Sequence, residues 1–296
     1  MTEWAIASAQ GGVCLDLAGA LYRLAPALAR MGEAGPATAI GLFEDWEASR
    51  RLLERVAGEM REEDRVAEGE RLAPLLYPGK ILCAGANYYD HLAEMGMPGA
   101  RKEEQRLFFF FKPARQAVVG PGATVRMPIG TQAFDWEVEL AVVIGRRARA
   151  VPEAEALDYV AGYSVAIDFS ARDFNRAPET FYKLDWVAGK GHDTCCPMGP
   201  VVMPASRVGD PQGLGLRLWV NGALKQDGHS SGMIFSVAEQ IATLSRIMTL
   251  EPGDVVLTGT PAGVGVPRGS FLAVGDDVVA EIEGIGRLAV TIMESA

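Results

Sequence analysis

One short segment, residues 135–145, constrains the fold of this chain more than any other. Its first five residues read Asp-Trp-Glu-Val-Glu, and an apolar run rich in β-branched residues follows and ends at Gly145. Such a run, bounded by a turn residue, predicts a buried strand. Alternate side chains of a strand share a face, so Glu137 and Glu139 are expected to point the same way at its mouth. Two such carboxylates repel each other unless a cation or a shared proton offsets their charge.

A third carboxylate, Asp168, lies near the end of another apolar run that predicts a second buried strand. Three carboxylates without a nearby His or Cys suit a hard cation such as Mg²⁺, Mn²⁺ or Ca²⁺ better than zinc. The alternative is that Glu139 alone is buried and pairs with an arginine, while Glu137 lies at the surface. Spacing by itself leaves both interpretations open.

The composition disfavours several classes of partner. The chain has 296 residues, 49% of them hydrophobic, and a formal net charge of −10. This allows a sizeable core and argues against nucleic acid or an anionic membrane as a partner. The four cysteines show no Cys-x-x-Cys spacing, and Cys195 and Cys196 are adjacent, so we expect reduced thiols in a cytoplasmic protein. The sequence predicts neither a signal peptide nor a membrane span.

The chain changes character near residue 75. Residues 44–71 are strongly charged, with apolar residues at helical spacing, and predict a surface helix. From residue 80 onward, short apolar runs alternate with Gly and Pro, which favours a closed or rolled mixed sheet. Helices are expected at about 153–161 and 237–249, the second with a capping box at its start. The predicted strands are 81–84, 107–111, 137–144, 163–169, 214–220, 254–257, 277–282 and 287–292.

A second constellation pairs His91 with Glu94, three residues apart. On a helical turn such residues are neighbours, and a carboxylate beside an imidazole orients it as a base that can take a proton from water. The alternative is an incidental ion pair on a surface helix. The Gly- and Pro-containing, charged residues 95–106 predict a mobile connection, for which a lid is one use. His192 and His229 lie in polar loops and are given no role.

Two further segments carry polar chemistry. Lys190 stands between two glycines, which frees it to reach an anionic ligand, although an ordinary turn lysine has the same pattern. Residues 258–265, Thr-Gly-Thr-Pro-Ala-Gly-Val-Gly, follow a predicted strand and can present backbone N–H groups to a carboxylate. They match neither a phosphate-binding P-loop nor a dinucleotide fingerprint.

Taken together, these segments resemble the fumarylacetoacetate hydrolase superfamily, in its acylpyruvase-like branch. The resemblance runs from Lys80 to the C-terminus. It rests on an ordered set of motifs, which are residues 80–88, the His91 and Glu94 pair, 111–113, 135–140, 168–173, 189–200, 221–222, 233–235 and 253–261.

The resemblance implies an α+β fold with a mixed β-roll catalytic domain, residues 76–296, and a small N-terminal α/β domain, residues 1–75, usually in a homodimer. It implies Mg²⁺ or Mn²⁺, with Ca²⁺ an option in crystals, held by the residues that match Glu137, Glu139 and Asp168. It also implies that His91 and Glu94 form a catalytic pair on a lid that orders when a ligand binds.

The resemblance further implies substrate contacts. Lys190 matches a contact to the developing enolate, and Thr260, with Gly259 in the same turn, matches a contact to the substrate carboxylate. Asn175 matches a position where many members carry the longer Gln, which puts a substrate contact there in question. Residues 176–187 look individual to this chain, and their aromatics either shape the substrate tail or serve packing. Asp135 and Trp136 are interpreted as flanks of the site.

Three functions follow as hypotheses. The first is a metal-dependent hydrolase that cleaves a carbon–carbon bond in a β-diketo acid, of acylpyruvate or fumarylacetoacetate type, with water activated by His91. The second uses the same 2-oxo acid chemistry for decarboxylation, isomerisation or dehydration of an oxaloacetate-, hydroxymuconate- or sugar-acid-like substrate. The third is a non-catalytic dicarboxylate-binding or structural-metal protein, and the His91 and Glu94 pair speaks against it.

Overall fold

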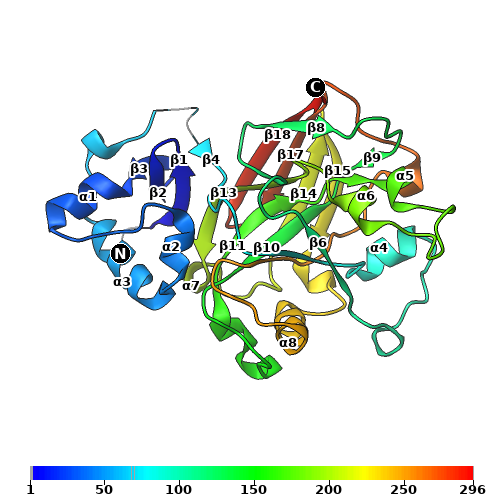
Figure 1. The fold of residues 1–296 in the computed structure, drawn as a ribbon, viewed down its shortest axis with the longest axis horizontal. Helices are drawn as coiled ribbons and strands as arrows, with labels where there is room; N and C mark the ends of the chain where they lie inside the picture. The colour runs from blue at the N-terminus through cyan, green and yellow to red at the C-terminus, as the bar shows by residue number, and fades with distance from the viewer. Residues whose placement is uncertain (1–2, 68, 70, 296) are drawn as a thin grey trace.

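The computed structural model describes residues 3–295 except 68 and 70, and it shows a mixed α+β fold. Two β-sheets pack on each other to form the body of the molecule (Figure 1). The larger sheet runs in the order β3-β2-β1-β13-β11-β10-β16-β5-β6, and the smaller runs in the order β15-β14-β17-β18-β8. Most pairs are antiparallel, but β16 with β5, β18 with β8 and β13 with β7 are parallel. The predicted fold class is therefore confirmed.

The strands that carry the site lie at the centre of the larger sheet. They are β5 (Ile81–Ala84), β6 (Phe109–Lys112), β10 (Val138–Ile144), β11 (Val160–Ile167), β13 (Cys196–Pro204) and β16 (Val255–Leu257). The smaller sheet is built from β8 (Thr124–Met127), β14 (Gly215–Val220), β15 (Ala223–His229), β17 (Asp277–Ile282) and β18 (Gly286–Glu294). Short strands β7 (Val118–Val119), β9 (Phe134–Asp135) and β12 (Ser170–Ala171) complete this part.

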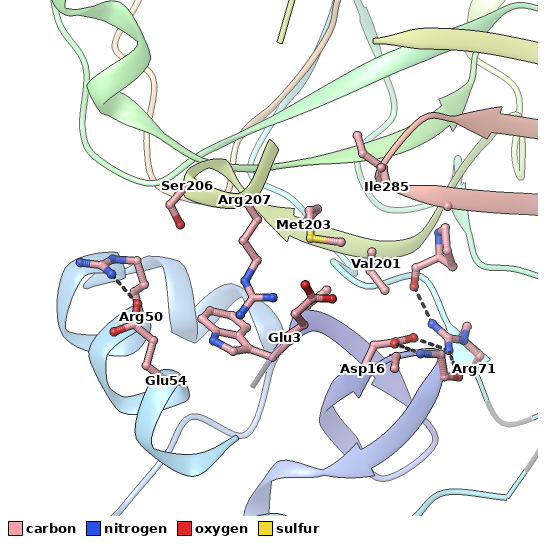
Figure 2. Close-up of a pocket in the computed structure, with 17 residues that line it drawn as sticks. Glu3, Asp16, Arg50, Glu54, Arg71, Val201, Met203, Ser206, Arg207 and Ile285 are labelled. Carbon is pink, nitrogen blue, oxygen red and sulfur yellow. Dashed lines mark hydrogen bonds and ion pairs between the residues drawn. The ribbon is translucent and has the colours of Figure 1, made fainter. Parts of the chain in front are cut away.

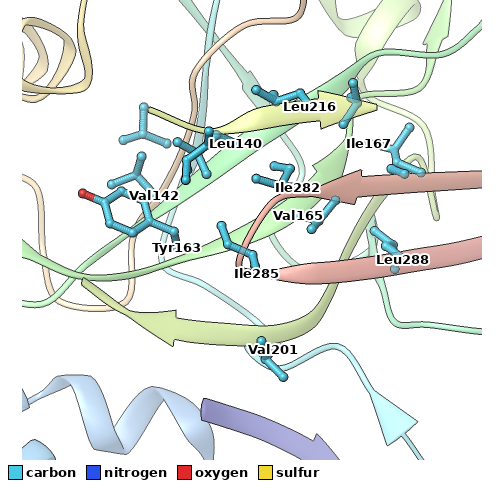
Figure 3. Close-up of a cluster of buried hydrophobic side chains, with 14 of the residues drawn as sticks. Leu140, Val142, Tyr163, Val165, Ile167, Val201, Leu216, Ile282, Ile285 and Leu288 are labelled. Carbon is cyan, nitrogen blue, oxygen red and sulfur yellow. The ribbon is translucent and has the colours of Figure 1, made fainter. Parts of the chain in front are cut away.

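The main core lies between the two sheets. Leu140, Val142 and Val165 of the larger sheet face Leu216 and Ile282 of the smaller one (Figure 3). All of these side chains are fully buried. Each such aliphatic side chain contributes about 2 kcal/mol when it leaves water, so this face fixes the register of β10 and β11. The fixed register of β10 in turn places the carboxylates at its start.

The N-terminal elements form a smaller lobe beside the body (Figure 1). They are β1 (Ala5–Ala9), β2 (Gly12–Leu17), β3 (Ala20–Arg23), α1 (Leu24–Met31), α2 (Ala39–Phe43), α3 (Trp46–Val56) and the short β4 (Arg71–Leu72). Strand β1 pairs with β13 at Ile6 and Val202, so the larger sheet continues into this lobe. Its helices share a core cluster with Val143 and Val255 of the body. The boundary near residue 75 stays a prediction.

Helices are few in the body. They are α4 (Tyr89–Glu94), α5 (Arg172–Asn175), α6 (Trp186–Lys190), α7 (Ala205–Val208) and α8 (Val237–Ile247). None of the helices among the described residues combines the length and the apolar character that crossing a membrane requires.

Most predicted elements of the body are present, with shifted ends. All eight predicted strands occur, and 81–84 and 277–282 match to the residue. The helix expected at 153–161 is wrong in type and end, because Glu153–Tyr159 is a 3₁₀-helix and Val160 already starts β11. The helix expected across 44–71 is shorter, since α3 ends at Val56. The sequence analysis does not predict β1–β4, β7–β9, β12, β13 or β15.

The predicted capping box of α8 is confirmed. The Ser236 hydroxyl accepts a hydrogen bond from Glu239 N at 3.2 Å, and the Glu239 carboxylate accepts one from Ser236 N at 2.8 Å. We expect Ser236→Ala to lower the free energy of unfolding by about 1 kcal/mol, because the N–H of Glu239 loses its partner. Urea titration at neutral pH measures this, with Ser206→Ala, at an exposed serine of α7, as the control. Equal stability of Ser236→Ala and wild type would contradict the assignment.

Candidate metal and active site

Three carboxylates meet where β10 begins and β11 ends. Glu137, Glu139 and Asp168 each offer one oxygen, and these atoms all lie within 4.8 Å of one another. The pairing of Val138 with Ile167 brings the two strand ends together, and Asp168 N donates to Glu137 O at 2.8 Å. All three side chains are buried. The alternative with Glu137 at the surface is therefore wrong.

The like charges perturb one another strongly. Burial raises the pKa of Glu139 well above its ordinary value, and the neighbouring Asp168 and Glu137 add to the rise. Glu137 behaves in the opposite way: burial disfavours its charge, but Arg172 and Lys190 hold its pKa well below the usual range. Glu139 is thus the carboxylate of the cluster whose positive neighbours do not offset its burial and the nearby negative charges.

Two cations already contact the cluster. Lys190 Nζ, at the end of α6, donates to Glu137 Oε2 and to Asp168 Oδ2, at 2.5 and 2.7 Å. Arg172, the first residue of α5, donates through Nη2 to Glu137 Oε1 at 2.6 Å. Lys190 is only 4% exposed, so the alternative of an ordinary turn lysine is wrong. Its ammonium contacts two of the three carboxylates that would hold a metal cation.

Lys112 is a third cation at the cluster and is fully buried. The sequence analysis did not single it out as a site residue. From β6 its Nζ donates to Asp168 Oδ1 at 2.7 Å, and also to Phe169 O and Lys190 O. Lys112 therefore fixes both Asp168 and the end of α6. The available signal was a lysine that closes an otherwise aromatic strand, Phe109–Lys112.

The donor set fits a hard divalent cation. Carboxylate oxygens are the ligands that Mg²⁺, Mn²⁺ and Ca²⁺ prefer, and the cluster contains neither His nor Cys. The raised pKa of Glu139 is what a cation at this position would reverse, because an adjacent positive charge favours the ionised carboxylate. The residues present are thus compatible with the metal that the sequence resemblance implies.

His91 is buried and Glu94 is mostly buried, with side chains 7% and 12% exposed, so the alternative of an incidental pair on the surface is wrong. His91 Nδ1 lies 2.9 Å from Glu94 Oε1 on α4, and the His91 residue is 6% exposed. The His91 side chain is close enough to Glu137 to favour the charged form of that carboxylate. Asn87, just before α4, anchors the helix: its side chain donates to Thr258 O and accepts from Phe235 N.

The glycine-rich loop after β16 presents its N–H groups to carboxylates, as predicted, but the carboxylates belong to the protein itself. Gly259 N donates to Glu139 Oε2 at 2.5 Å. Gly263 N donates to both oxygens of Glu94, at 3.0 and 2.9 Å. Gly265 N donates to Asp135 Oδ1 at 2.7 Å. One loop therefore contacts both the metal-type cluster and the His91 and Glu94 pair.

Asp135 is more than a flank, which corrects the interpretation from sequence. Its side chain is fully buried, accepts from Gly265 N and Val266 N, and pairs with Arg172 Nε at 2.9 Å. Burial raises the pKa of Asp135, although Arg172 and the Gly265 N–H oppose the rise. Asp135 and Glu137 share the same arginine, so Asp135 links the start of β10 to the loop. Trp136 donates to Gly263 O and supports the same loop.

The predicted substrate-contact residues lie around the cluster with partners of their own. The Thr260 hydroxyl donates to Val138 O and accepts from Gln226 Nε2, both at 2.8 Å. Asn175, on α5, donates to Asp185 O and packs against Gly189 next to Lys190. Contacts of Asn175, Gly259 and Thr260 to a substrate stay predictions.

The segment 176–187 divides into a packed and an exposed part. Trp186 stacks on Phe110 with ring centroids 5.0 Å apart, and the Lys190 ammonium lies 5.1 Å from the centroid of the same Phe110 ring. Phe181 and Tyr182 project outward, 90% and 83% exposed. Packing therefore accounts for Trp186 and leaves the other two aromatics without a partner in the core.

A cavity of about 1000 Å³ lies elsewhere, between the N-terminal lobe and the body (Figure 2). Its wall mixes both signs of charge, and two of its side chains, Asp16 and Arg71, pair with each other at 2.7 Å. None of the predicted site residues lines it. The carboxylate cluster, which combines buried charge with a buried imidazole, is the better candidate for chemistry.

Comparisons with known proteins relate the chain to one family. Residues 80–293 match the family model for the fumarylacetoacetate (FAA) hydrolase C-terminal domain. An oxaloacetate tautomerase, fahd2, mitochondrial, of Xenopus laevis is 41% identical over 74% of this chain, and the match spans 66%, just under two thirds, of that protein's own length.

Two solved structures are also similar. Maleylpyruvate hydrolase from Sphingobium sp. SYK-6, in complex with manganese(II) ion and pyruvate, superposes with a TM-score of 0.77 and 28% identity over 99% of this chain and 100% of that one. Fumarylpyruvate hydrolase from Pseudomonas aeruginosa, in complex with Mn²⁺ and pyruvate, gives a TM-score of 0.65 and 35% identity over 73% of this chain and 90% of that one.

Proposed function

Since the chain belongs to the fumarylacetoacetate hydrolase family, we propose that it is a divalent-metal-dependent hydrolase that cleaves a carbon–carbon bond in an acylpyruvate-type β-diketo acid. The observation that carries the proposal is a buried His91, paired with Glu94, close to a cluster of three buried carboxylates. The hydrolases of similar structure, whose names specify manganese and pyruvate, support the choice of substrate class.

In this proposal Glu137, Glu139 and Asp168 would hold Mg²⁺ or Mn²⁺. When bound, the ion would supply Lewis acidity to the oxygens of a 2-oxo acid. Lys112 and Arg172 keep Asp168 and Glu137 in place through hydrogen bonds of 2.7 and 2.6 Å. Burial of this whole group strengthens its electrostatic effect on a substrate, because little water screens it.

His91 is proposed to carry the proton. The contact of Nδ1 with ionised Glu94 favours the tautomer with the proton on Nδ1, which leaves Nε2 able to take a proton from water. The resulting hydroxide attacks the distal carbonyl carbon, the adjacent carbon–carbon bond breaks, and a carboxylic acid and the enolate of pyruvate leave. The Lys190 ammonium offers positive charge to that enolate before a proton returns to its carbon.

Tautomerisation of a 2-oxo diacid is a second candidate, because relatives of this chain are named oxaloacetate tautomerases. In that reaction His91 moves a proton between carbon and oxygen, and no water is consumed. The two candidates share the residues and differ in the product. The homodimer and a cytoplasmic location stay predictions and bear on neither choice.

A substrate screen tests the proposal. Purified protein with Mn²⁺ or Mg²⁺ is expected to consume acylpyruvates, with loss of enol absorbance and with product masses equal to pyruvate plus the matching acid. The same protein treated with EDTA is expected to be inactive and to recover when metal is added. Turnover of oxaloacetate enol to its keto form, without cleavage of any acylpyruvate, would favour the tautomerase. Undiminished hydrolysis in EDTA would refute the metal-dependent mechanism.

A further inference from the structure

The carboxylate of Glu94 has more partners than His91 alone. Oε1 contacts His91 Nδ1, and the N–H of Gly263 bridges both oxygens. Arg268 Nη1 also donates a hydrogen bond to Oε2 at 3.3 Å. Glu94 is 12% exposed at its side chain, whereas Arg268 is 51% exposed. Arg268 thus brings a positive charge from the surface to the buried carboxylate that orients the base.

Arg268 is itself held in position. The same Nη1 donates to Val264 O at 2.9 Å, and Arg268 ends the 3₁₀-helix Val266–Arg268. Asp135 fixes the start of that turn by accepting from Gly265 N and Val266 N. Because Arg172 joins Asp135 to Glu137, the loop that carries Arg268 is tied to the carboxylate cluster.

Two glycines make this loop path possible. Gly263 has a φ of +118°, and a Cβ there would lie 2.2 Å from Lys225 O. A Cβ at Gly265 would lie 1.9 Å from Ser270 O and 2.8 Å from Asp135 Oδ1. Glycine therefore lets the backbone approach closely enough for its N–H groups to reach Glu94 and Asp135. The backbone that precedes Arg268 is therefore closely packed on both sides of Val264.

The positive charge of Arg268 opposes the effect of burial on the Glu94 carboxylate. Burial disfavours the ionised form of Glu94, but the hydrogen bonds from His91 and Gly263, together with the charge of Arg268, hold its pKa below the ordinary value. An ionised, fixed Glu94 keeps the proton of neutral His91 on Nδ1. Without that restraint the imidazole can rotate or carry its proton on Nε2, where it cannot act as a base.

We propose that Arg268 is a positioning residue: it fixes the Glu94 carboxylate and thereby the orientation and tautomer of His91. The inference rests on the proposed function for its kinetic consequence only, since the state of the imidazole is measurable without turnover. Residues that orient a catalytic ligand or base from outside the site commonly change activity by about 10- to 100-fold.

The test compares Arg268→Gln with Arg268→Lys. With Mn²⁺ and a substrate that the wild type turns over, Arg268→Gln is expected to lower kcat about tenfold with little change in KM. Arg268→Lys is expected to restore most of the rate. Arg217→Gln, which removes an arginine of matched exposure that pairs with Asp227, is the control.

A second measurement needs no activity. Nitrogen-15 spectra of the metal-free protein, which has three histidines, report the tautomer of His91 once its signals are assigned with His91→Ala. The wild type and Arg268→Lys are expected to show the proton on Nδ1, and Arg268→Gln a mixture. An unchanged tautomer in Arg268→Gln would overturn the inference, whether or not the rate falls. If no acylpyruvate is turned over, the proposed hydrolase fails, and these spectra still decide the role of Arg268.

Discussion

Replacing Glu139 by glutamine is expected to abolish measurable Mn²⁺ binding and to lower metal-dependent turnover at least about a hundredfold, since the Lewis acid supplies several kcal/mol of stabilisation. The substitution keeps the size of the side chain and removes one of three charges that converge within 4.8 Å. Metal affinity is measured by calorimetry with Mn²⁺, and turnover by loss of enol absorbance.

The same variant is expected to fold well. Glu139 is the carboxylate whose charge burial, Asp168 and Glu137 disfavour, so a neutral amide relieves repulsion in the metal-free protein. We therefore expect metal-free Glu139→Gln to be at least as stable as wild type in urea, and Mn²⁺ to stabilise only the wild type. Glu281→Gln, at a carboxylate of β17 paired with Arg287, is the control. Wild-type Mn²⁺ affinity in Glu139→Gln would remove this residue from the metal site.

Replacing His91 by alanine is expected to lower kcat for hydrolysis by about 10²- to 10⁴-fold, the usual contribution of a positioned general base. Mn²⁺ affinity should change little, because the imidazole is not among the three carboxylate ligands proposed here. Steady-state kinetics and calorimetry on the same preparation separate the two effects. His229→Ala removes an exposed imidazole that contacts Ser231 and is the matched control.

The His91 variant also distinguishes the reaction types. If His91→Ala retains wild-type hydrolysis, water activation by His91 is not part of the mechanism. If it loses cleavage of acylpyruvates but retains enol–keto exchange of oxaloacetate, cleavage depends on His91 and the exchange uses another proton carrier. The first result contradicts the proposed hydrolase mechanism, and the second confines it to cleavage.

Local pattern predicted the central strands because burial imposes a simple period on them. The run after Glu139 is apolar throughout, the run before Asp168 is mostly apolar, and β10 and β11 are buried at every residue. The N-terminal strands β1–β3 escaped prediction because their short, small-residue runs have no clear alternation, and pairing with β13 completes them. The 3₁₀-helix at Glu153–Tyr159 differs from the expected α-helix because β11 begins directly after it.

The charged residues of the site also divide into those that the sequence predicts and those that only the packing brings together. Sequence spacing indicated that Glu137 and Glu139 share a face, and the apolar approach to Asp168 indicated a carboxylate that needs a partner. Spacing did not indicate which cationic side chains pair with these carboxylates. Lys112 and Arg172 come from separate elements, and only the packing of β6 and α5 against the strand ends brings them within 2.7 Å of the carboxylates.

What the sequence by itself determined is the local arrangement of the reactive groups: Glu137 and Glu139 share one face of a strand, and an imidazole and a carboxylate lie one helical turn apart. These follow from periodicities of two and of 3.6 residues, which are properties of the local backbone. The tertiary structure decided the connections. The loop 263–268 contacts both Glu94 and Asp135. Gly263 lies 169 residues after Glu94, and Gly265 lies 130 residues after Asp135. No local pattern encodes such a contact, because it exists only once both sheets have packed and closed the loop over the strand ends.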